Sequence, residues 1–410
     1  GLAFAVAIVL MGNEFYTVEL QTFITMEHTS KSVDLIVALL VFCGFTKSAM
    51  MPFSGWLLGA MVAPTPTSAL LHSSTMVKAG VFLIIKLCPM LGTNPAGIMT
   101  MMVGGITFLF ASCAAISQSD GKKVLAYSTI SNLGLIVCCS GIGTYEAAWT
   151  AIMIVIFHAV AKSLCFLSVG TAEQQLGNRN IENFDGMFNS MPHLSLCMLA
   201  GICGMFLAPF GMLISKWAAM KSFVDSGHPM LVLILVFGSS TTLFYWCKWL
   251  GKICAYIPVD DKKEEGIHFE QWIALKSLAT MTVLVCLAFP LISEYAVSPY
   301  LGTIYRRVVE VISRGNLIIM CVMVLILLAL PFRFGKGRQK KQVVTQLSGV
   351  NVGDNSAYYG PAGSVVPVTL RNWYMETWFG ERKMLICGFT MSIACMLMAF
   401  SILCGGVFHA

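Results

Sequence analysis

Long apolar stretches separated by short polar ones dominate this chain of 410 residues. Stretches of helical length lie near residues 34–50, 68–90, 97–118, 124–142, 146–171, 193–206, 228–250, 269–292, 315–332 and 384–408, and residues 1–12 resemble half of another. A helix of about 20 apolar residues spans the hydrocarbon core of a bilayer. The pattern therefore predicts an all-α polytopic membrane protein with about ten to eleven transmembrane helices. Because the chain opens inside an apolar stretch, we expect further N-terminal helices to precede it.

Composition and charge agree with this prediction. The chain is 57% hydrophobic and 11% charged, with a mean hydropathy of +0.78. Most cations fall in one set of alternate loops, which includes Lys122, Arg179, Lys248 and the long polar stretch 333–383. We expect the protein to lie in the plasma (inner) membrane of the cell. The positive-inside rule then places these cationic loops on the cytoplasmic side. The net charge of +6 thus needs no nucleic-acid partner.

Titratable nitrogens occur inside the apolar stretches, and no carboxylate accompanies them. They belong to Lys47, Lys78, Lys86, Lys162, Lys216, Lys276, His72 and His158. A charged lysine at the centre of a membrane helix costs about 2.5–3.5 kcal/mol on insertion scales. Two explanations remain open: some of these lysines are neutral part of the time and carry protons, or their anionic partners lie on another segment or chain.

Spacing indicates which of these groups can act together. His158 and Lys162 are four residues apart, so they share one face of a helix and can exchange a proton directly or through one water. His72 and Lys78 are six residues apart and point about 120° away from each other. Lys86 and Lys276 lie near helix ends, where a lysine can extend to the headgroups. The candidate proton relay is therefore Lys47, His72, Lys78, His158, Lys162 and Lys216.

Two prolines interrupt apolar stretches close to relay lysines. Pro52 follows Lys47, and Pro209 precedes Lys216. Proline removes a backbone donor and clashes with the preceding turn. We therefore expect two broken helices that line a wet cavity, although two ordinary proline kinks would give the same sequence. The stretch 333–383 contains turn residues and either packs on a neighbouring subunit or forms a disordered loop.

Several motifs resemble the antiporter-like subunits shared by respiratory complex I, Mrp-type sodium/proton antiporters and energy-converting membrane hydrogenases. They are residues 46–53 (TKSAMMPF), 63–72 (APTPTSALLH), 75–80 (TMVKAG) and 123–134 (KVLAYSTISNLG), with the His158/Lys162 pair and Ser215–Lys216. Residues 349–355 (GVNVGDN) and 371–376 (RNWYME) resemble in particular the large antiporter-like subunit of Ech-type hydrogenases.

The resemblance implies an inverted-repeat fold around a hydrophilic axis. Residues 1–90 would be the remainder of the first repeat and 97–250 the second, followed by C-terminal helices in 251–410. Lys47 matches the middle lysine of the first half-channel, and Lys216 matches the outlet of the second. His72, Lys78 and Lys162 match the connecting residues. A glutamate that pairs with the first lysine in this family would precede Gly1.

The sequence thus predicts a proton-translocating subunit of a redox-driven complex, with an energy-converting nickel–iron hydrogenase as the preferred assignment. Its expected partners are sister membrane subunits, a peripheral hydrogenase or dehydrogenase module, and the bilayer. No cofactor, metal or catalytic centre is expected on this chain, because nucleotide loops, metal-ligand clusters and nucleophile motifs are absent from the sequence. The alternatives are an Mrp-type sodium/proton antiporter subunit, a complex I quinone oxidoreductase subunit, and a structural membrane subunit that conducts nothing.

Overall fold

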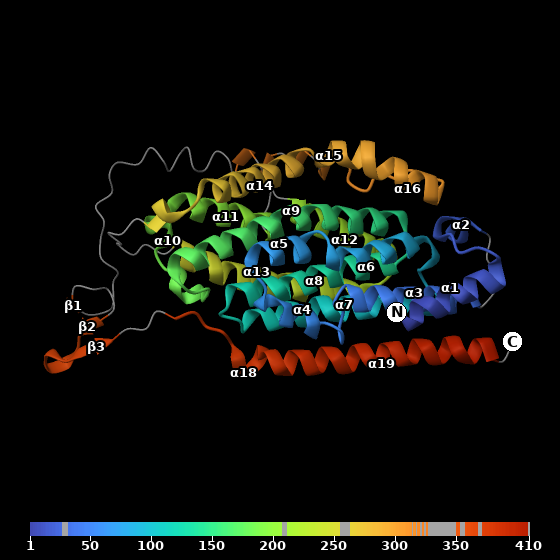
Figure 1. Ribbon diagram of the computed structural model, residues 1–410, viewed down its shortest axis with the longest axis horizontal. Helices are drawn as coiled ribbons and strands as arrows, with labels where there is room; N and C mark the ends of the chain where they lie inside the picture. The colour runs from blue at the N-terminus through green and yellow to red at the C-terminus, as the bar shows by residue number, and fades with distance from the viewer. Residues whose placement is uncertain are drawn as a thin grey trace.

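The computed structural model describes residues 1–26, 32–206, 211–254, 263–313, 350–352, 357–367 and 371–408, together with isolated residues between 315 and 326. Its described helices are α1 (Leu2–Phe15), α2 (Leu20–Thr25), α3 (Ser32–Lys47), α4 (Gly55–Gly59), η1 (Ala60–Val62), α5 (Thr65–Ser73), α6 (Met76–Leu87), η2 (Cys88–Met90), α7 (Pro95–Ile116), α8 (Gly121–Gly141), α9 (Tyr145–Leu176), η3 (Ile181–Phe184), α10 (Met187–Ser190), α11 (Pro192–Phe206), α12 (Gly211–Asp225), α13 (Pro229–Ile253), η4 (Lys263–Gly266), α14 (Phe269–Leu287), α15 (Phe289–Ile292), the π-helical η5 (Ser293–Val297), α16 (Ser298–Tyr305), η6 (Pro361–Gly363), α18 (Glu376–Phe379) and α19 (Glu381–Phe408). Most of them run along one axis as a bundle (Figure 1).

The prediction of a helical, multi-pass membrane protein is confirmed. Within the described ranges, eight helical segments are long and apolar enough to cross a membrane. The sequence predicted about ten to eleven transmembrane helices, and the difference has two identifiable reasons. The stretches near 1–12 and 34–50 form α1 and α3, which are shorter than a full span, and most of 315–332 lies outside the described residues.

Helices α7, α8 and α9 form the centre of the bundle. Each begins at a residue whose side chain accepts a hydrogen bond from the first turn: Asn94 for α7, Asp120 for α8 and Thr144 for α9. Such caps satisfy amide groups that a helix start leaves without partners. Helices α7 and α8 approach closely where Gly104 and Gly134 face each other. The central helices are therefore fixed both at their ends and along their contact.

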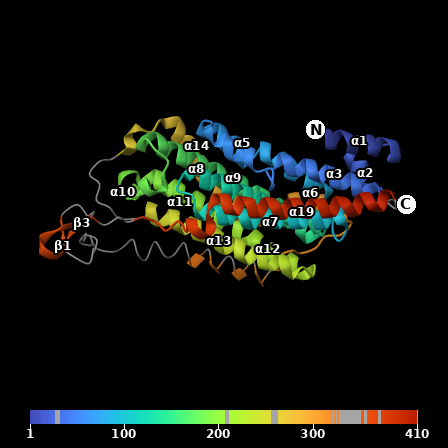
Figure 2. The same ribbon diagram turned by 90° about the horizontal axis from the view of Figure 1, so that it is seen from below.

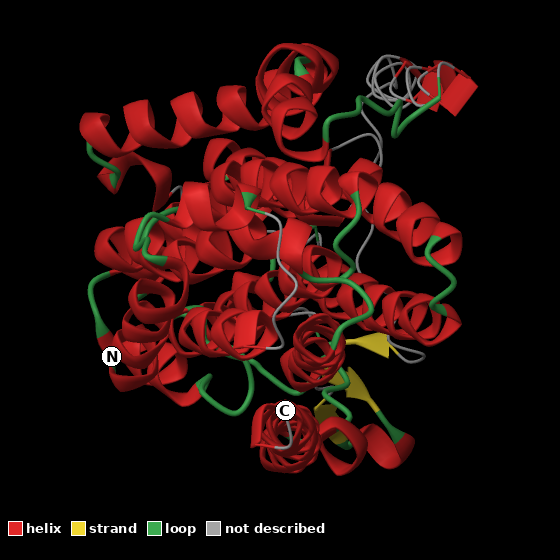
Figure 3. Cartoon of the chain, turned by 90° about the vertical axis from the view of Figure 1, so that its right-hand side faces the viewer, coloured by secondary structure: helices red, strands yellow, loops and turns green. Residues whose placement is uncertain are grey.

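The outer helices flank this centre. In Figure 1, α14, α15 and α16 run along one edge of the bundle, and α19 runs along the opposite edge. Figure 2 shows α19 lying along α7, against which it packs. Figure 3, seen nearly along the helix axes, shows α19 at the margin of the bundle. The buried middle is therefore formed by α7, α8 and α9, with α5, α6, α11, α12 and α13 packed against them.

The helix that contains Lys47 is interrupted near Pro52, as the sequence predicts. Helix α3 ends at Lys47, residues 48–54 form turns, and α4 begins at Gly55. Pro209, the second predicted break, lies outside the described residues. The assignment of residues 1–90, 97–250 and 251–410 to repeats stays a prediction.

A further interruption, between α5 and α6, was not predicted. The hydroxyl of Thr75 donates a hydrogen bond to the carbonyl oxygen of Leu70 at 3.0 Å, and Ser74 contacts the same oxygen at 3.4 Å. Hydroxyl side chains that bond to nearby carbonyls compete with the helical ladder. This competition accounts for an interruption without proline or glycine.

The long polar stretch contains a small sheet that the sequence did not predict. Strands β1 (Val350–Asn351), β2 (Ala357–Tyr359) and β3 (Val365–Pro367) pair in that order, and both pairs are antiparallel. Tyr358 is the central register position, opposite Asn351 on one side and Val366 on the other. Figure 1 shows the sheet beyond the end of the bundle at which α10 and α18 lie. Residues 353–356, which include part of the predicted turn, lie outside the described residues.

Candidate functional site

Three of the predicted relay residues lie together in the buried middle of the bundle. His158 and Lys162 are fully buried on α9, and Lys78 on α6 is 6% exposed. Lys78 interacts electrostatically with Lys162, and His158 interacts with both lysines. We refer to Lys78, His158 and Lys162 as the central triad.

The lysines of the central triad have neutral partners. Lys162 Nζ donates hydrogen bonds to the hydroxyl of Ser128 and, at 3.5 Å, to the carbonyl oxygen of Leu125. The same ammonium lies 5.2 Å from the centre of the Trp246 ring. Lys78 Nζ donates to the carbonyl oxygen of Val155 at 3.5 Å. Among the described residues, no carboxylate forms an ion pair with either lysine.

Buried hydroxyl groups accompany the central triad. Ser73 and Ser163 share a hydrogen bond of 2.6 Å between α5 and α9, and Ser112 and Ser131 share one of 2.6 Å between α7 and α8. The sequence reasoning did not select Ser112, Ser128, Ser131 or Ser163 as site residues. The sequence does show that these serines lie inside apolar helices. It does not show which other helix each hydroxyl group faces.

The two histidines have unused hydrogen-bonding capacity. Neither ring nitrogen of His72 or of His158 has a hydrogen-bond partner among the described residues. His72 is 1% exposed, and its ring centre lies 6.1 Å from that of Phe166 on α9. An unpaired buried polar atom costs about 1–3 kcal/mol. Such atoms are therefore suited to partners that bind transiently, as a proton relay requires.

No described hydrogen bond or ion pair joins the remaining relay candidates, Lys47, His72 and Lys216, to the central triad. Lys216 is 9% exposed on α12, and none of its described contacts is a hydrogen bond or ion pair. Helix α12 packs on α9 where Gly211 meets the ring of Phe157. Lys47 ends α3 beside Gly80 and is exposed. The roles of Lys47, His72 and Lys216 stay predictions.

Lys86 and Lys276 make aromatic contacts away from this site. Lys86 Nζ lies 4.6 Å from the ring centre of Tyr300, and Lys276 Nζ lies 5.4 Å from that of Trp272. Lys276 is exposed. These positions agree with the peripheral role expected for both lysines.

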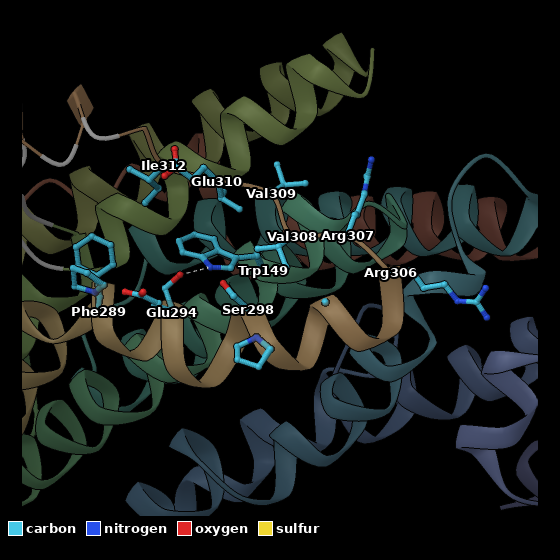
Figure 4. Close-up of a pocket in the computed structure, with 15 residues that line it drawn as sticks. Trp149, Phe289, Glu294, Ser298, Arg306, Arg307, Val308, Val309, Glu310 and Ile312 are labelled. Carbon is cyan, nitrogen blue, oxygen red and sulfur yellow. Dashed lines mark hydrogen bonds between the residues drawn. The ribbon is translucent and has the colours of Figure 1, made fainter.

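A cavity of about 940 Å³ opens beside α9 and is lined by Trp149, Glu294, Ser298 and residues 306–312 (Figure 4). Trp149 Nε1 donates a hydrogen bond to the hydroxyl of Ser293 at 2.8 Å. Trp149 precedes His158 by nine residues and therefore faces the opposite side of α9, at about 100° per residue. None of the residues that line this cavity belongs to the central triad. In the described part of the chain, no group of three or more His, Cys, Asp or Glu residues is arranged to hold a metal ion.

Known proteins similar to this chain belong to ion-translocating membrane complexes. The family model described as "NADH:quinone oxidoreductase/Mrp antiporter, TM" matches residues 1–242. A Staphylococcus haemolyticus protein named as antiporter subunit mnhA2 is 30% identical over 338 residues, which are 74% of this chain and 42% of that protein. Its namesake in Staphylococcus epidermidis is 40% identical over 206 residues, 47% of this chain and 25% of that protein. The chain thus spans less than half the length of these curated relatives.

Two solved structures resemble the fold. A chain of the Mrp complex from Dietzia sp. DQ12-45-1b has a TM-score of 0.68 and 28% identity, covering 82% of this chain and 39% of that one. A chain of the membrane-bound sulfane sulfur reductase, an archaeal respiratory membrane complex, has a TM-score of 0.63 and 21% identity, covering 74% of this chain and 62% of that one. The second likeness concerns the fold alone.

Proposed function

Because the chain belongs to the NADH:quinone oxidoreductase/Mrp antiporter transmembrane family, we propose that it is the proton-conducting part of an Mrp-type sodium/proton antiporter subunit. It would act with sister membrane subunits in a multisubunit complex of the plasma membrane, with residues 333–383 on the cytoplasmic side. The similarity to antiporter subunits favours this assignment over the hydrogenase that the sequence motifs indicated.

The observation that carries this proposal is the central triad. Lys78, His158 and Lys162 place three titratable side chains within electrostatic reach of one another inside the bundle, and no described carboxylate forms an ion pair with either lysine. Two like charges held close in a medium of low dielectric repel each other strongly. Lys78 and Lys162 therefore favour a state in which only one of them is protonated. The neutral amine is then ready to accept the next proton, and His158, which interacts with both lysines, is the candidate intermediate carrier.

The lysines of the central triad also favour proton movement over sodium binding in this part of the chain. Sodium, like other hard cations, prefers oxygen ligands, and carboxylates are the strongest of these. Lys78 and Lys162 would repel a sodium ion instead. We therefore assign sodium binding to another part of the complex.

Lys162→Ala in the complete antiporter complex tests the proposal. Everted membrane vesicles report sodium-driven proton movement through a pH-sensitive fluorescent dye. We expect Lys162→Ala to lower the initial rate on the order of a hundredfold, as is typical for loss of a positioned proton-transfer group. Lys276→Ala, at an exposed lysine, is the matched control and should retain the wild-type rate. Wild-type transport by Lys162→Ala would refute the proposal.

The hydrogenase alternative has a separate test. The motif 371–376, which resembles Ech-type subunits, is the feature that favours it. The chains that co-purify with this subunit distinguish the two assignments. Antiporter subunits alone support the Mrp assignment, whereas a nickel–iron hydrogenase pair would replace it.

A further inference from the structure

A second cavity, of about 570 Å³, lies at the end of the bundle that carries Lys122. It is enclosed by the start of α5, the start of α8, the end of α9 and the start of α14. Charged residues line it, among them Glu173, Lys122, Arg179 and Glu270. Its lining shares no residue with that of the cavity beside Trp149.

Glu173 is the best-connected carboxylate of this cavity. One oxygen lies 3.0 Å from Lys122 Nζ and accepts a hydrogen bond of 3.3 Å from the hydroxyl of Thr65. The other oxygen lies 3.8 Å from Arg179. The Glu173 side chain is 32% exposed, whereas that of Lys122 is 5% exposed. Glu173 is therefore open to the cavity on one side and bound to a buried cation on the other.

The position of Glu173 on α9 relates it to Lys162. The two residues are eleven positions apart, which is about three turns and about 16 Å, and they share one face of the helix. Phe166 and Val169 occupy the same face between them, and both are fully buried. Direct contact along α9 is therefore blocked by apolar side chains.

The neighbouring helix α8 contacts both Glu173 and Lys162. Lys122 extends from the first turn of α8 to Glu173. One turn further, the carbonyl oxygen of Leu125 accepts a hydrogen bond from Lys162, and the hydroxyl of Ser128 accepts another. The first turn of α8 thus contacts Glu173 at the cavity, and its next two turns contact Lys162 of the central triad.

We propose that Glu173 collects protons at this cavity and supplies them to the central triad, or releases them in the reverse direction. This inference rests on the proposed function and names the group that connects the relay to the aqueous phase. In each cycle water in the cavity gives a proton to a carboxylate oxygen of Glu173. That O–H bond then breaks as Glu173 passes the proton to a hydrogen-bonded chain of water molecules, and the last water of the chain gives a proton to the neutral amine of Lys162. One O–H or N–H bond forms for each O–H bond that breaks, and Glu173 returns to its charged state.

The charges around Glu173 set the conditions for this cycle. Lys122 faces it from α8 and Arg179 from the segment after α9, and Asp120 holds Arg179 by an ion pair of 2.7 Å. Glu270 lines the cavity from α14 but, among the described residues, forms no ion pair with this cluster. Protonation of Glu173 frees Lys122 and Arg179 from their shared partner, so proton uptake and rearrangement of this cluster are coupled.

The experiment compares Glu173→Gln with Glu270→Gln in everted vesicles that contain the complete complex. Glu270 lines the same cavity but forms no ion pair among the described residues, which makes it a matched control. We expect Glu173→Gln to reduce the initial rate on the order of a hundredfold and Glu270→Gln to leave it unchanged. Glu173→Asp keeps a titratable group and should retain transport with a shifted pH profile, which a purely structural ion pair would not produce.

The outcomes separate this inference from the proposed function. Loss of transport in Lys162→Ala together with a wild-type rate and pH profile in Glu173→Gln overturns the role of Glu173 alone. Transport that survives Lys162→Ala overturns the proposed function itself. If Glu173→Gln fails to assemble, Glu173→Asp decides: a pH profile that superimposes on that of the wild type overturns the inference.

Discussion

The hydroxyl of Tyr127 donates a hydrogen bond to a carboxylate oxygen of Glu381 at 2.6 Å and thereby joins α8 to the first residue of α19. The second oxygen accepts a hydrogen bond from the Gln118 amide at 3.2 Å. Tyr127 is fully buried, whereas the Glu381 side chain is 37% exposed. One carboxylate thus holds the C-terminal helix against the central helices at the end of the bundle where α8 begins.

Removal of this carboxylate should loosen α19. We expect Glu381→Ala to lower the free energy of unfolding by about 1–3 kcal/mol, because the buried Tyr127 hydroxyl loses its partner. The midpoint of thermal unfolding of the purified complex measures the change. Glu376→Ala, at an exposed glutamate five residues earlier, is the control and should leave the midpoint unchanged. Equal midpoints for both variants would contradict the prediction.

The central helices could be predicted closely from the sequence. The apolar stretches near 97–118, 124–142 and 146–171 correspond to α7, α8 and α9, which end within a few residues of these limits. Their length and apolar character are local properties, and capping residues precede each one. The pairing of His158 with Lys162 also follows from spacing within one helix.

Contacts between distant segments could not be predicted in this way. Lys248 was grouped with the loop cations, but it lies in α13, where it is 9% exposed. Its ammonium donates to the carbonyl oxygen of Ile116, the last residue of α7, at 2.6 Å and to that of Gln118, two residues later, at 3.0 Å. A cation is favourable at a helix C-terminus. The partners are more than 100 residues from Lys248 in the sequence, so no local pattern identifies them.

The hydroxyl of Ser128 should support transport through Lys162. We expect Ser128→Ala to reduce the initial transport rate roughly tenfold, equivalent to about 1.4 kcal/mol, because Lys162 loses its hydroxyl partner. Vesicle assays with equal amounts of assembled complex measure the rate. Ser140→Ala is the control, since that hydroxyl donates only to Ile136 within α8 at 2.9 Å. Identical rates for the two variants would show that Ser128 does not assist Lys162.

The close contact of α7 and α8 should not tolerate a methyl group. A Cβ atom at Gly134 would lie 2.6 Å from the backbone nitrogen of Phe108 and 2.7 Å from the carbonyl oxygen of Gly104. Both neighbours are backbone atoms and can move only with their helix. We expect Gly134→Ala to lower the free energy of unfolding by about 1–3 kcal/mol, measured as a lower thermal midpoint.

Gly251→Ala provides the comparison for this variant. No heavy atom lies within 4 Å of a Cβ atom at Gly251, which is exposed on α13. This variant should unfold at or slightly above the wild-type midpoint, because alanine favours helix more than glycine by about 1 kcal/mol. A midpoint for Gly134→Ala as high as that for Gly251→Ala would contradict the packing argument.

The segment before α19 docks on Glu182, and this contact should depend on pH. Glu182 accepts hydrogen bonds from the hydroxyl of Tyr374 and from the backbone nitrogen of Asn372 at 3.2 Å, and Lys252 lies 2.9 Å from it. Burial alone would raise the pKa of Glu182, but the hydrogen bonds from Tyr374 and Lys252 and the Lys252 charge hold it below its ordinary value of 4.5. A carboxyl group with a lowered pKa stabilises the fold above its unfolded value, and that stability disappears as the pH falls through the folded value.

Glu182→Gln should therefore unfold at a lower temperature than the wild type at pH 7, where the carboxylate is fully charged. The difference should shrink progressively below pH 4.5, because the wild-type carboxyl group then becomes protonated and loses its ion pair. Thermal midpoints measured from neutral to acidic pH give both curves. Glu265→Gln, at an exposed glutamate, should follow the wild type throughout. If the difference in thermal midpoint between Glu182→Gln and the wild type stayed constant with pH, Glu182 would stabilise the fold by its packing and not by its charge.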